Sequence, residues 1–282
     1  MNWSFKIDIL STNTVERFEP LTNNCYECIV KFISNNDDDG LEQYLGQLVE
    51  SLNVSQNVKW NKLNIIDKMY ILTDIRGICI FPNIKLVVTD KEKGKMSYTV
   101  DLGEIERSIE SNYIPSIVCK DKEYNTEIIL HYPHEWDNKN ELISYISEVT
   151  VDDITIPGNE ISTDDISKII DRLSPHIYGK LNKAKDTLEK SISKMKFVNV
   201  SSKIVSFKVD ELLHYIKLLF SDTLTNVVEL NYVLVKLANI SMESIMKLTP
   251  IDAQLYYKMF LKEQAQRNKK QQKADGKGVS FS

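Results

Sequence analysis

The sequence predicts an α+β fold, with helical N- and C-terminal regions around a central part that contains β-hairpins. Apolar residues recur at helical spacing before about residue 80 and again after about residue 210. Between these regions the pattern changes to the two-residue alternation of strands, interrupted by Lys/Gly and Asp/Asn turns. With 282 residues, 42% of them hydrophobic, the chain is long enough to bury a substantial core.

These changes of period divide the chain into four parts. Residues 1–80 are expected to be mainly helical, and residues 81–210 to be a mixed α/β region with hairpins. Residues 211–268 are expected to be helical, and residues 269–282 to be a flexible basic tail.

The N-terminal region opens with a short strand and then turns helical. Residues 5–9 alternate apolar and polar side chains, as a half-buried strand does. One helix is expected through Cys25 and Cys28. A second, from Leu41 to Leu52, carries a single apolar stripe, and a third is expected from about residue 63 to residue 78.

Two hairpins and two helices are expected in the central region. Residues 84–102 and 116–133 each contain two apolar runs around a polar turn, and residues 148–158 are expected to be extended. Helices are expected over residues 162–173 and 174–195, because each starts at a serine that is suited to cap it.

The C-terminal region is expected to contain three helices. The first two cover residues 209–220 and 223–240, and the last begins in "LTPIDAQLYYKMFLKEQ". There Thr249 is a natural N-cap, Pro250 suits the first helical position, and Asp252 completes a pair resembling a capping box.

Composition excludes several classes of function. A net charge of −5 argues against a general nucleic-acid binder, since the only basic cluster lies near the C-terminus. No apolar run is long enough for a membrane helix, and the first residues do not resemble a secretory signal. Four scattered cysteines indicate a reducing compartment, not a disulfide framework.

Cys25 and Cys28 have the Cys-x-x-Cys spacing of zinc sites and redox thiols. A zinc site needs a second pair of ligands, but Cys79 and Cys119 lie far apart in the sequence. Cys25 and Cys28 share helical spacing with Ile29 and the apolar residues that follow, so core packing is favoured over a metal or redox role.

Residues 35–46 resemble a calcium-binding loop in part. Asp37, Asp39 and Gly40 fit such a loop, but Gly46 stands where a bidentate Glu is needed. A polar turn before a helix explains the acidic run more simply.

His131, His134 and Glu135 also suggest a metal site at first. The zinc protease motif needs two His four residues apart on a helix, whereas these are three apart beside Pro133. A turn at a strand end is therefore favoured. The sequence also lacks phosphate-binding loops, dinucleotide fingerprints and nucleophile elbows, so we expect no catalytic residue, no bound metal and no cofactor.

Three stretches carry a resemblance to a known family. They are "KLNIIDKMYILTDIRGICI" (62–80), "MSYTVDLGEIE" (96–106) and "NISMESIMKLTPIDAQLYYKMFLKE" (239–263). Together and in this order they resemble the baseplate hub and baseplate assembly proteins of T-even-like contractile-tailed bacteriophages. Members of that family can carry a cysteine pair in the hairpin near residues 88–96, but this chain has none there, so no metal knuckle is expected.

The resemblance implies a non-enzymatic tail protein that acts in baseplate structure or assembly. Its partners would be other tail and baseplate proteins, with self-association left open, and with no nucleic acid or membrane. Its location would be the virion tail baseplate, or the host cytoplasm during assembly. The sequence leaves open whether the protein stays in the virion or is a transient chaperone.

The residues we consider first for partner contact are Tyr256, Tyr257 and Phe260 in the last helix. Their helical spacing is equally typical of core packing. Two alternative functions remain: an enzyme of an unrecognised family acting on cell-wall or nucleotide substrates, and a helical adaptor protein. A cluster of titratable groups with shifted pKa values in a deep pocket would favour the enzyme.

The interpretation of the cysteine pair gives a first testable prediction. Replacing Cys25 and Cys28 together by alanine should lower the free energy of unfolding without loss of a bound metal, because packing contacts are removed and no ligands are. Metal analysis and denaturant unfolding of both proteins check this. Release of zinc by the double substitution would contradict it.

Overall fold

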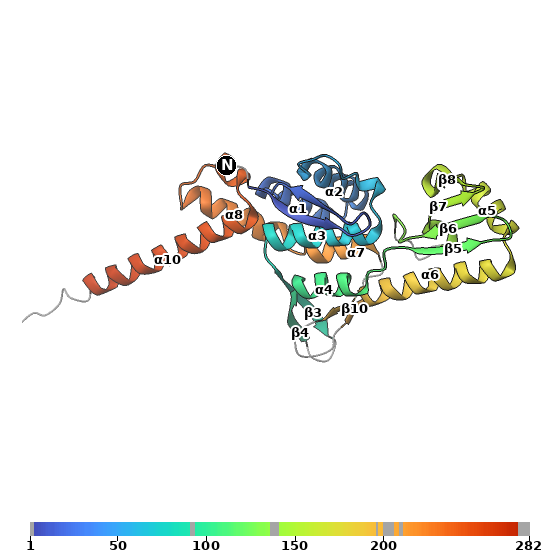
Figure 1. The fold of residues 1–282 in the computed structure, drawn as a ribbon. Coiled ribbons are helices and arrows are strands. Elements are labelled where there is room, and N and C mark those ends of the chain that lie inside the picture. Colours follow the sequence, from blue (N-terminus) through green and yellow to red (C-terminus); the bar gives the residue numbers. More distant parts are fainter. Residues whose placement is uncertain are drawn as a thin grey trace, which may run out of the picture.

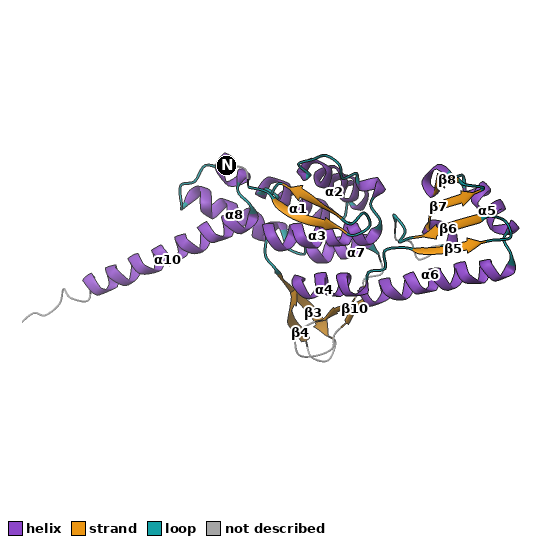
Figure 2. Ribbon diagram, in the orientation of Figure 1, coloured by secondary structure: helices purple, strands orange, loops and turns teal. Residues whose placement is uncertain are grey.

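A computed structural model confirms the α+β class. Helices dominate, and the strands of the described residues pair into small antiparallel sheets (Figure 2). The structure describes residues 3–90, 94–135, 141–195, 197–199, 206–208 and 211–275.

The N-terminal region begins with a hairpin, not with a lone strand before helices. β1 (Phe5–Ile9) pairs antiparallel with β2 (Thr14–Phe18), and the chain turns at Asn13 with a left-handed φ of 52°. The expectation of a direct change from strand to helix was therefore wrong. The sequence of β2 does not indicate a strand clearly, because four of its five side chains are exposed or partly exposed and the alternation of apolar and polar residues is weak.

The three expected N-terminal helices follow the hairpin, and each begins at a residue whose side chain caps it. The side chains of Thr22, Asp37 and Asn64 accept hydrogen bonds from backbone N–H groups in the first turns. These helices are α1 (Asn23–Asn35), α2 (Asp38–Leu52) and α3 (Ile65–Cys79), with the short 3-10 helix η1 (Trp60–Lys62) before α3.

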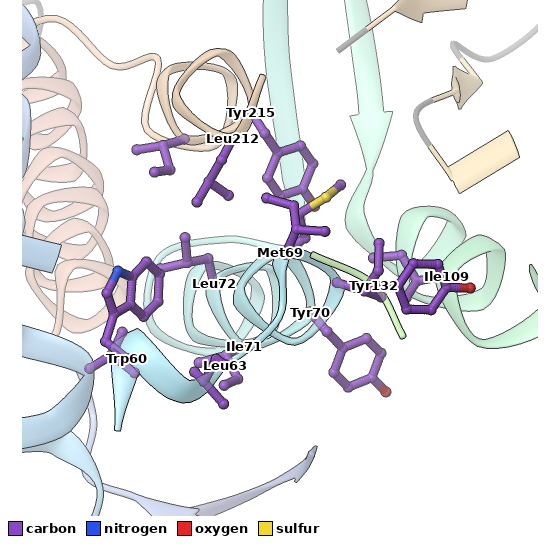
Figure 3. Packing of buried hydrophobic residues seen from close by; sticks show 14 of the residues in the cluster. Trp60, Leu63, Met69, Tyr70, Ile71, Leu72, Ile109, Tyr132, Leu212 and Tyr215 are labelled. Carbon is purple, nitrogen blue, oxygen red and sulfur yellow. The ribbon is translucent and has the colours of Figure 1, made fainter. Parts of the chain in front are cut away.

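The centre of the main core is α3, whose side chains are buried on every side of the helix (Figure 3). Met69 and Leu72 point toward Leu212 and Tyr215, which belong to a helix near the C-terminus. Polar residues of α3 are buried as well. The Arg76 guanidinium, for example, donates from Nε to the carbonyl oxygen of Leu219 at 2.7 Å.

The first predicted hairpin is present, and a helix that the sequence did not predict follows it. β3 (Asn83–Asp90) pairs with β4 (Gly94–Asp101), and α4 (Leu102–Asn112) begins directly afterwards. Asp101 caps α4 by accepting from the backbone N–H of Gly103 at 3.0 Å. Leu102, Ile105 and Ile109, at positions i, i+3 and i+7, form its buried stripe.

The next strands and helices form a lobe in which one sheet packs on a long helix. The segment expected to be extended over residues 148–158 is a hairpin, because Asp152 and Asp153 adopt left-handed φ values of 49° and 67° and turn the chain. The sheet has the order β5 (Ile117–Asp121), β6 (Thr126–Leu130), β7 (Ile146–Val151) and β8 (Ile154–Pro157). The helices of the lobe are η2 (Leu142–Tyr145), η3 (Gly158–Glu160), α5 (Thr163–Arg172) and α6 (Pro175–Met195).

The C-terminal helices belong to two different cores. The first of them, α7, contacts α3, whereas the helices after it form a small second core of Leu234, Ile245 and Ala253. Before α7 lie the paired strands β9 (Phe197–Asn199) and β10 (Ser206–Lys208). The helices are α7 (Leu212–Leu219), α8 (Leu224–Lys236), α9 (Met242–Lys247) and α10 (Pro250–Asp275).

The molecule is elongated (Figure 1). The body around α3 lies in the middle, the lobe lies at one end, and α10 projects from the other end. The division of the sequence into four parts stays a prediction. Part of the expected basic tail is helical, because α10 reaches Asp275, and residues 276–282 lie outside the described residues.

Carboxyl groups gather where α3 packs on α4. Asp74 of α3 lies beside Glu106 of α4, and the Tyr70 hydroxyl donates to Glu110 Oε1 at 2.6 Å. Burial, the hydrogen bond that the protonated Asp74 carboxyl donates to Glu106, and the nearby negative charges raise the pKa of Asp74 to about 8. Burial also raises the pKa of Glu106. One proton is therefore held between Asp74 and Glu106 near neutral pH.

This shared proton makes stability depend on pH. The folded-state pKa of Asp74 is above the ordinary value of 3.8, so the folded state binds the proton more tightly than the unfolded state does. Its contribution is complete below about pH 4 and is lost as pH rises toward about 8. Asp74→Asn should remove this dependence and raise the free energy of unfolding at pH 8 by something on the order of 2 kcal/mol.

Urea unfolding at pH 5 and pH 8 measures the effect. Asp153→Asn is the matched control, because Asp153 is exposed and its turn tolerates asparagine. Equal pH dependence in the wild-type protein and in Asp74→Asn would contradict the prediction.

Candidate partner-binding surface

The last helix starts as its sequence predicts. Pro250 is the first residue of α10, the Thr249 hydroxyl donates to Asp252 Oδ2 at 2.7 Å, and the Asp252 N–H donates back to Thr249 Oγ1 at 3.2 Å. This reciprocal pair fixes the point and direction at which α10 leaves the body.

The first turns of α10 carry apolar side chains on two faces. Among the residues that the structure describes, other helices pack against only one of these faces. Ala253 is fully buried in the second core, and Tyr257 packs against it. On the other side Leu255, Tyr256 and Met259 are exposed by 48%, 48% and 60%. We call these three residues the outer stripe.

The structure separates the three residues expected to contact a partner. Tyr256 belongs to the outer stripe, whereas Tyr257 and Phe260 are partly buried. Their role in partner contact stays a prediction. Val228 and Tyr232 of α8, with exposed fractions of 47% and 59%, add apolar surface that the expectation did not include. Their i, i+4 spacing could have indicated it.

Two hollows flank the contact between α8 and α10. One, of about 480 Å³, is bounded by α1, α8 and α10, and the other, of about 430 Å³, runs along α8. Tyr257, Leu230 and Asn226 line both hollows. The surface around α8 and α10 is therefore grooved as well as apolar, which suits insertion of a partner's side chains.

One wall of the first hollow is formed by a partly buried polar network. Tyr26 donates a hydrogen bond to Asp222, whose Oδ2 lies 3.7 Å from Nη2 of the buried Arg76. Burial and the neighbouring Asp222 charge raise the pKa of the Tyr26 hydroxyl, so it stays protonated and donates. The network joins α1, α3 and the segment before α8, and Arg76 thereby supports the wall of the hollow.

A second polar contact fastens the C-terminal helices to α1. Asn23 Nδ2 donates to Asn231 Oδ1 at 2.8 Å, and Asn231 Nδ2 donates to Glu27 Oε2 at 3.1 Å. The Asn23 N–H also donates to the Leu248 carbonyl at 2.6 Å. Because both side chains are buried, the Asn23 amide group and the Asn231 Oδ1 atom depend on this contact for a hydrogen bond.

The cysteine pair lies at the edge of the core. The buried residues of α1 are Asn23, Tyr26, Ile29 and Val30. Cys25 packs partly against the core, but the expectation that Cys28 belongs to the core stripe was wrong. Contacts of α1 with α8 and α9 rotate its buried face toward Tyr26. Both thiols lie beside Tyr44 of α2, and burial together with these thiols raises the pKa of its hydroxyl.

The acidic run after α1 is a helix cap. Asp37 accepts from the Gly40 N–H at 3.0 Å, and α2 has already begun at Asp38. Gly46, where a calcium loop needs its bidentate Glu, is buried, and a Cβ there would lie 2.8 Å from Trp60 Cδ1.

The segment that contains His131 and His134 packs against the start of α3. His131 Nδ1 lies 3.3 Å from Asn64 Nδ2, and His134 Nδ1 lies 3.1 Å from the Leu63 carbonyl oxygen. Burial lowers the pKa of His131, which favours the neutral ring. Among the residues that the structure describes, no three His, Cys, Asp or Glu side chains are grouped to hold a metal ion. In that same part of the chain, every helix is too short or too polar to cross a membrane.

Comparison with protein families gives a match. The family model described as "T4 bacteriophage base plate protein" matches residues 1–217 of the 282-residue chain. The matched part ends inside α7, so it contains the body and the lobe but not α8–α10. Comparisons with curated proteins and with solved structures give no match.

The contact between Asn23 and Asn231 yields a prediction about local stability. Asn231→Leu leaves Asn23 buried without its acceptor, at a cost of about 1–3 kcal/mol. The substitution should lower the free energy needed to detach α8–α10 from the body. Their amide protons should therefore exchange faster, while those of α3 stay protected. Native-state hydrogen exchange measures both, with the exposed Asn226→Leu as control. Equal loss of protection in α3 would show that the contact does not act locally.

Proposed function

The chain belongs to the T4 bacteriophage base plate protein family, and from this premise we propose that it is a non-enzymatic protein of the tail baseplate that binds other tail proteins during assembly. The proposed contact surface consists of the outer stripe on one side of α10 and, on another side of the same helix, the hollows between α8 and α10. A role in the baseplate hub is the more specific form of the proposal, and it rests on the resemblance of the sequence to hub and assembly proteins.

The observation that carries this proposal is that α10 exposes apolar side chains outside the face that it buries in the second core. A helix that packs against one core needs one apolar face, and its solvent-facing side is expected to carry polar residues. Instead Leu255, Tyr256 and Met259 expose roughly half of their surface or more. Covering the exposed half of each such side chain would contribute on the order of 1 kcal/mol, so a partner that covers the outer stripe is physically favoured.

The rim of this surface supports specific binding. Lys258 Nζ lies 4.9 Å from the centre of the Phe81 ring, which holds its charge beside the hollow that it helps to line. Asp222 lines the same hollow. An apolar centre with separate charges at its edge is the arrangement that fixes the orientation of a bound protein.

The enzyme alternative has less support. Asp74, a carboxyl group with a strongly raised pKa, lies where α3 and α4 pack together. Neither Asp74 nor Glu106 lines the hollows around α8 and α10 or the hollow beside α5. A carboxyl pair placed in a packing interface acts on folding stability, as argued above.

The proposal is tested by isolating partners from cells that produce the phage. Tagged wild-type protein should co-purify with tail or baseplate proteins, identified by mass spectrometry. Leu255→Asp with Met259→Asp should reduce their recovery at least about tenfold, because charged side chains cannot be buried in an apolar contact. Val15→Asp with Val118→Asp is the matched control, since both residues are exposed apolar residues far from α10 in sequence.

Purified virions then separate two forms of the proposal. A structural component should be present in them, whereas an assembly chaperone should be found only in intermediates. The proposal fails if no tail protein co-purifies and both virions and intermediates lack the protein.

A further inference from the structure

The two ends of the molecule carry opposite charge. Residues 141–178 in the lobe contain eight Asp or Glu, one Lys and one Arg, and all eight acidic residues are exposed. The lysine, Lys168, is already paired with Asp165 at 2.9 Å. Residues 262–275 of α10 contain five Lys or Arg and two acidic residues. We call residues 262–275 the basic arm.

The acidic end contains a hollow of about 550 Å³ between η2, α5 and the start of α6. Its walls combine apolar side chains with two carboxylates, Glu141 and Asp171, and neither Lys nor Arg lines it. Tyr178, exposed by 48%, stands at its edge. The apolar lining is formed by Leu142, Ile143, Ile170, Leu173, Pro175 and Tyr178.

We propose that the basic arm of one copy of this chain binds the acidic hollow in the lobe of a second copy. Lys and Arg suit such a hollow, because their methylene stems cover apolar surface while their charged ends reach carboxylates at the rim. An Arg or Lys over the exposed Tyr178 ring would add a cation–π contact. The proposal concerns a surface other than the outer stripe, so it goes beyond the proposed function.

The geometry favours a second copy over contact within one chain. The lobe lies at one end of the body and α10 points away from the other end, so the arm cannot turn back to its own lobe (Figure 1). At 1.5 Å per residue the helical arm is about 21 Å long, which is enough to extend along the hollow. Both halves of the contact are present on each chain, so copies can join arm to lobe.

Such a contact is heterologous: two different surfaces meet, and each bound copy offers a free arm and a free lobe. Association should therefore rise with concentration beyond a dimer unless a ring closes. It should also be sensitive to salt, since exposed charges supply much of the attraction.

Sedimentation velocity of the full-length protein tests the first expectation. The average mass should increase with protein concentration at low ionic strength, and the increase should disappear near 1 M NaCl, where the screening length is about 3 Å. A monomer at every concentration in low salt would overturn the proposal. So would association that salt leaves unchanged.

Charge reversal tests which surfaces meet. The arm variant, Lys262→Glu with Arg267→Glu, and the lobe variant, Glu141→Lys with Asp171→Lys, should each weaken self-association at least about tenfold. Mixed together, the two variants should associate again, because the unaltered arm of the lobe variant can bind the unaltered lobe of the arm variant, and the two reversed surfaces are complementary as well. Lys190→Glu with Lys194→Glu, exposed at the far end of α6, is the matched control and should leave association unchanged.

Far-UV circular dichroism confirms folding of each variant before it is compared. Undiminished association of either variant, or no recovery in the mixture of folded variants, would overturn the proposal. Because none of these substitutions touches the outer stripe, recovery of tail proteins from cells reports on the proposed function separately.

Discussion

Burial of α3 on all sides is the constraint on which the rest of the structure depends. A helix that exposes no face to water must be enclosed by other elements, and the hairpin of β1 and β2, α4 and α7 supply that enclosure from distant parts of the sequence. Enclosure also requires that polar side chains of α3 find partners inside the protein. Arg76 does so through the Leu219 carbonyl and Asp222, and Thr73 through the Tyr215 hydroxyl. Thus α3 brings α4 and α7 into one core, although the strands and helices of the lobe lie between α4 and α7 in the sequence.

The same helix determines how the C-terminal part is attached. Arg76 reaches Asp222, just beyond α7, and Asp222 accepts from Tyr26 of α1, so the chain enters α8 at a fixed place. From there on, packing depends on the small second core and on the contact between Asn23 and Asn231. A small core contributes little free energy, so α8–α10 are the part most easily changed by a bound partner. The end of the family match at residue 217, just before the second core begins, agrees with this physical division.

The parts of the fold that depend on local chemistry were predictable from the sequence. The caps at Ser162 and Thr249 and the central hairpins follow from side chains within a few residues of each turn. The errors have tertiary causes. The buried face of α1 is turned toward Tyr26 and away from Cys28 because α8 and α9 pack there, about 200 residues later in the sequence. The distribution of α7 and α8 between two cores has no local signal either. For the candidate surface, the aromatic residues of α10 were identified, but which of them are exposed depends on the position of α8.

The low apolar content of α10 after Leu261 gives a last argument about how the molecule is built. A helix that leaves the body is surrounded by water, so it needs polar side chains on all sides. From Lys262 onward the sequence supplies mainly charged and amide side chains. A polar helix of this kind needs no internal core, so its composition is free to serve recognition. Its basic residues are concentrated at the end of the molecule opposite the acidic lobe, whereas a net charge of −5 alone would suggest a uniformly acidic protein. Opposite charges at the two ends give neighbouring copies a preferred direction even before any apolar contact forms, since electrostatic attraction acts over about 10 Å at moderate salt.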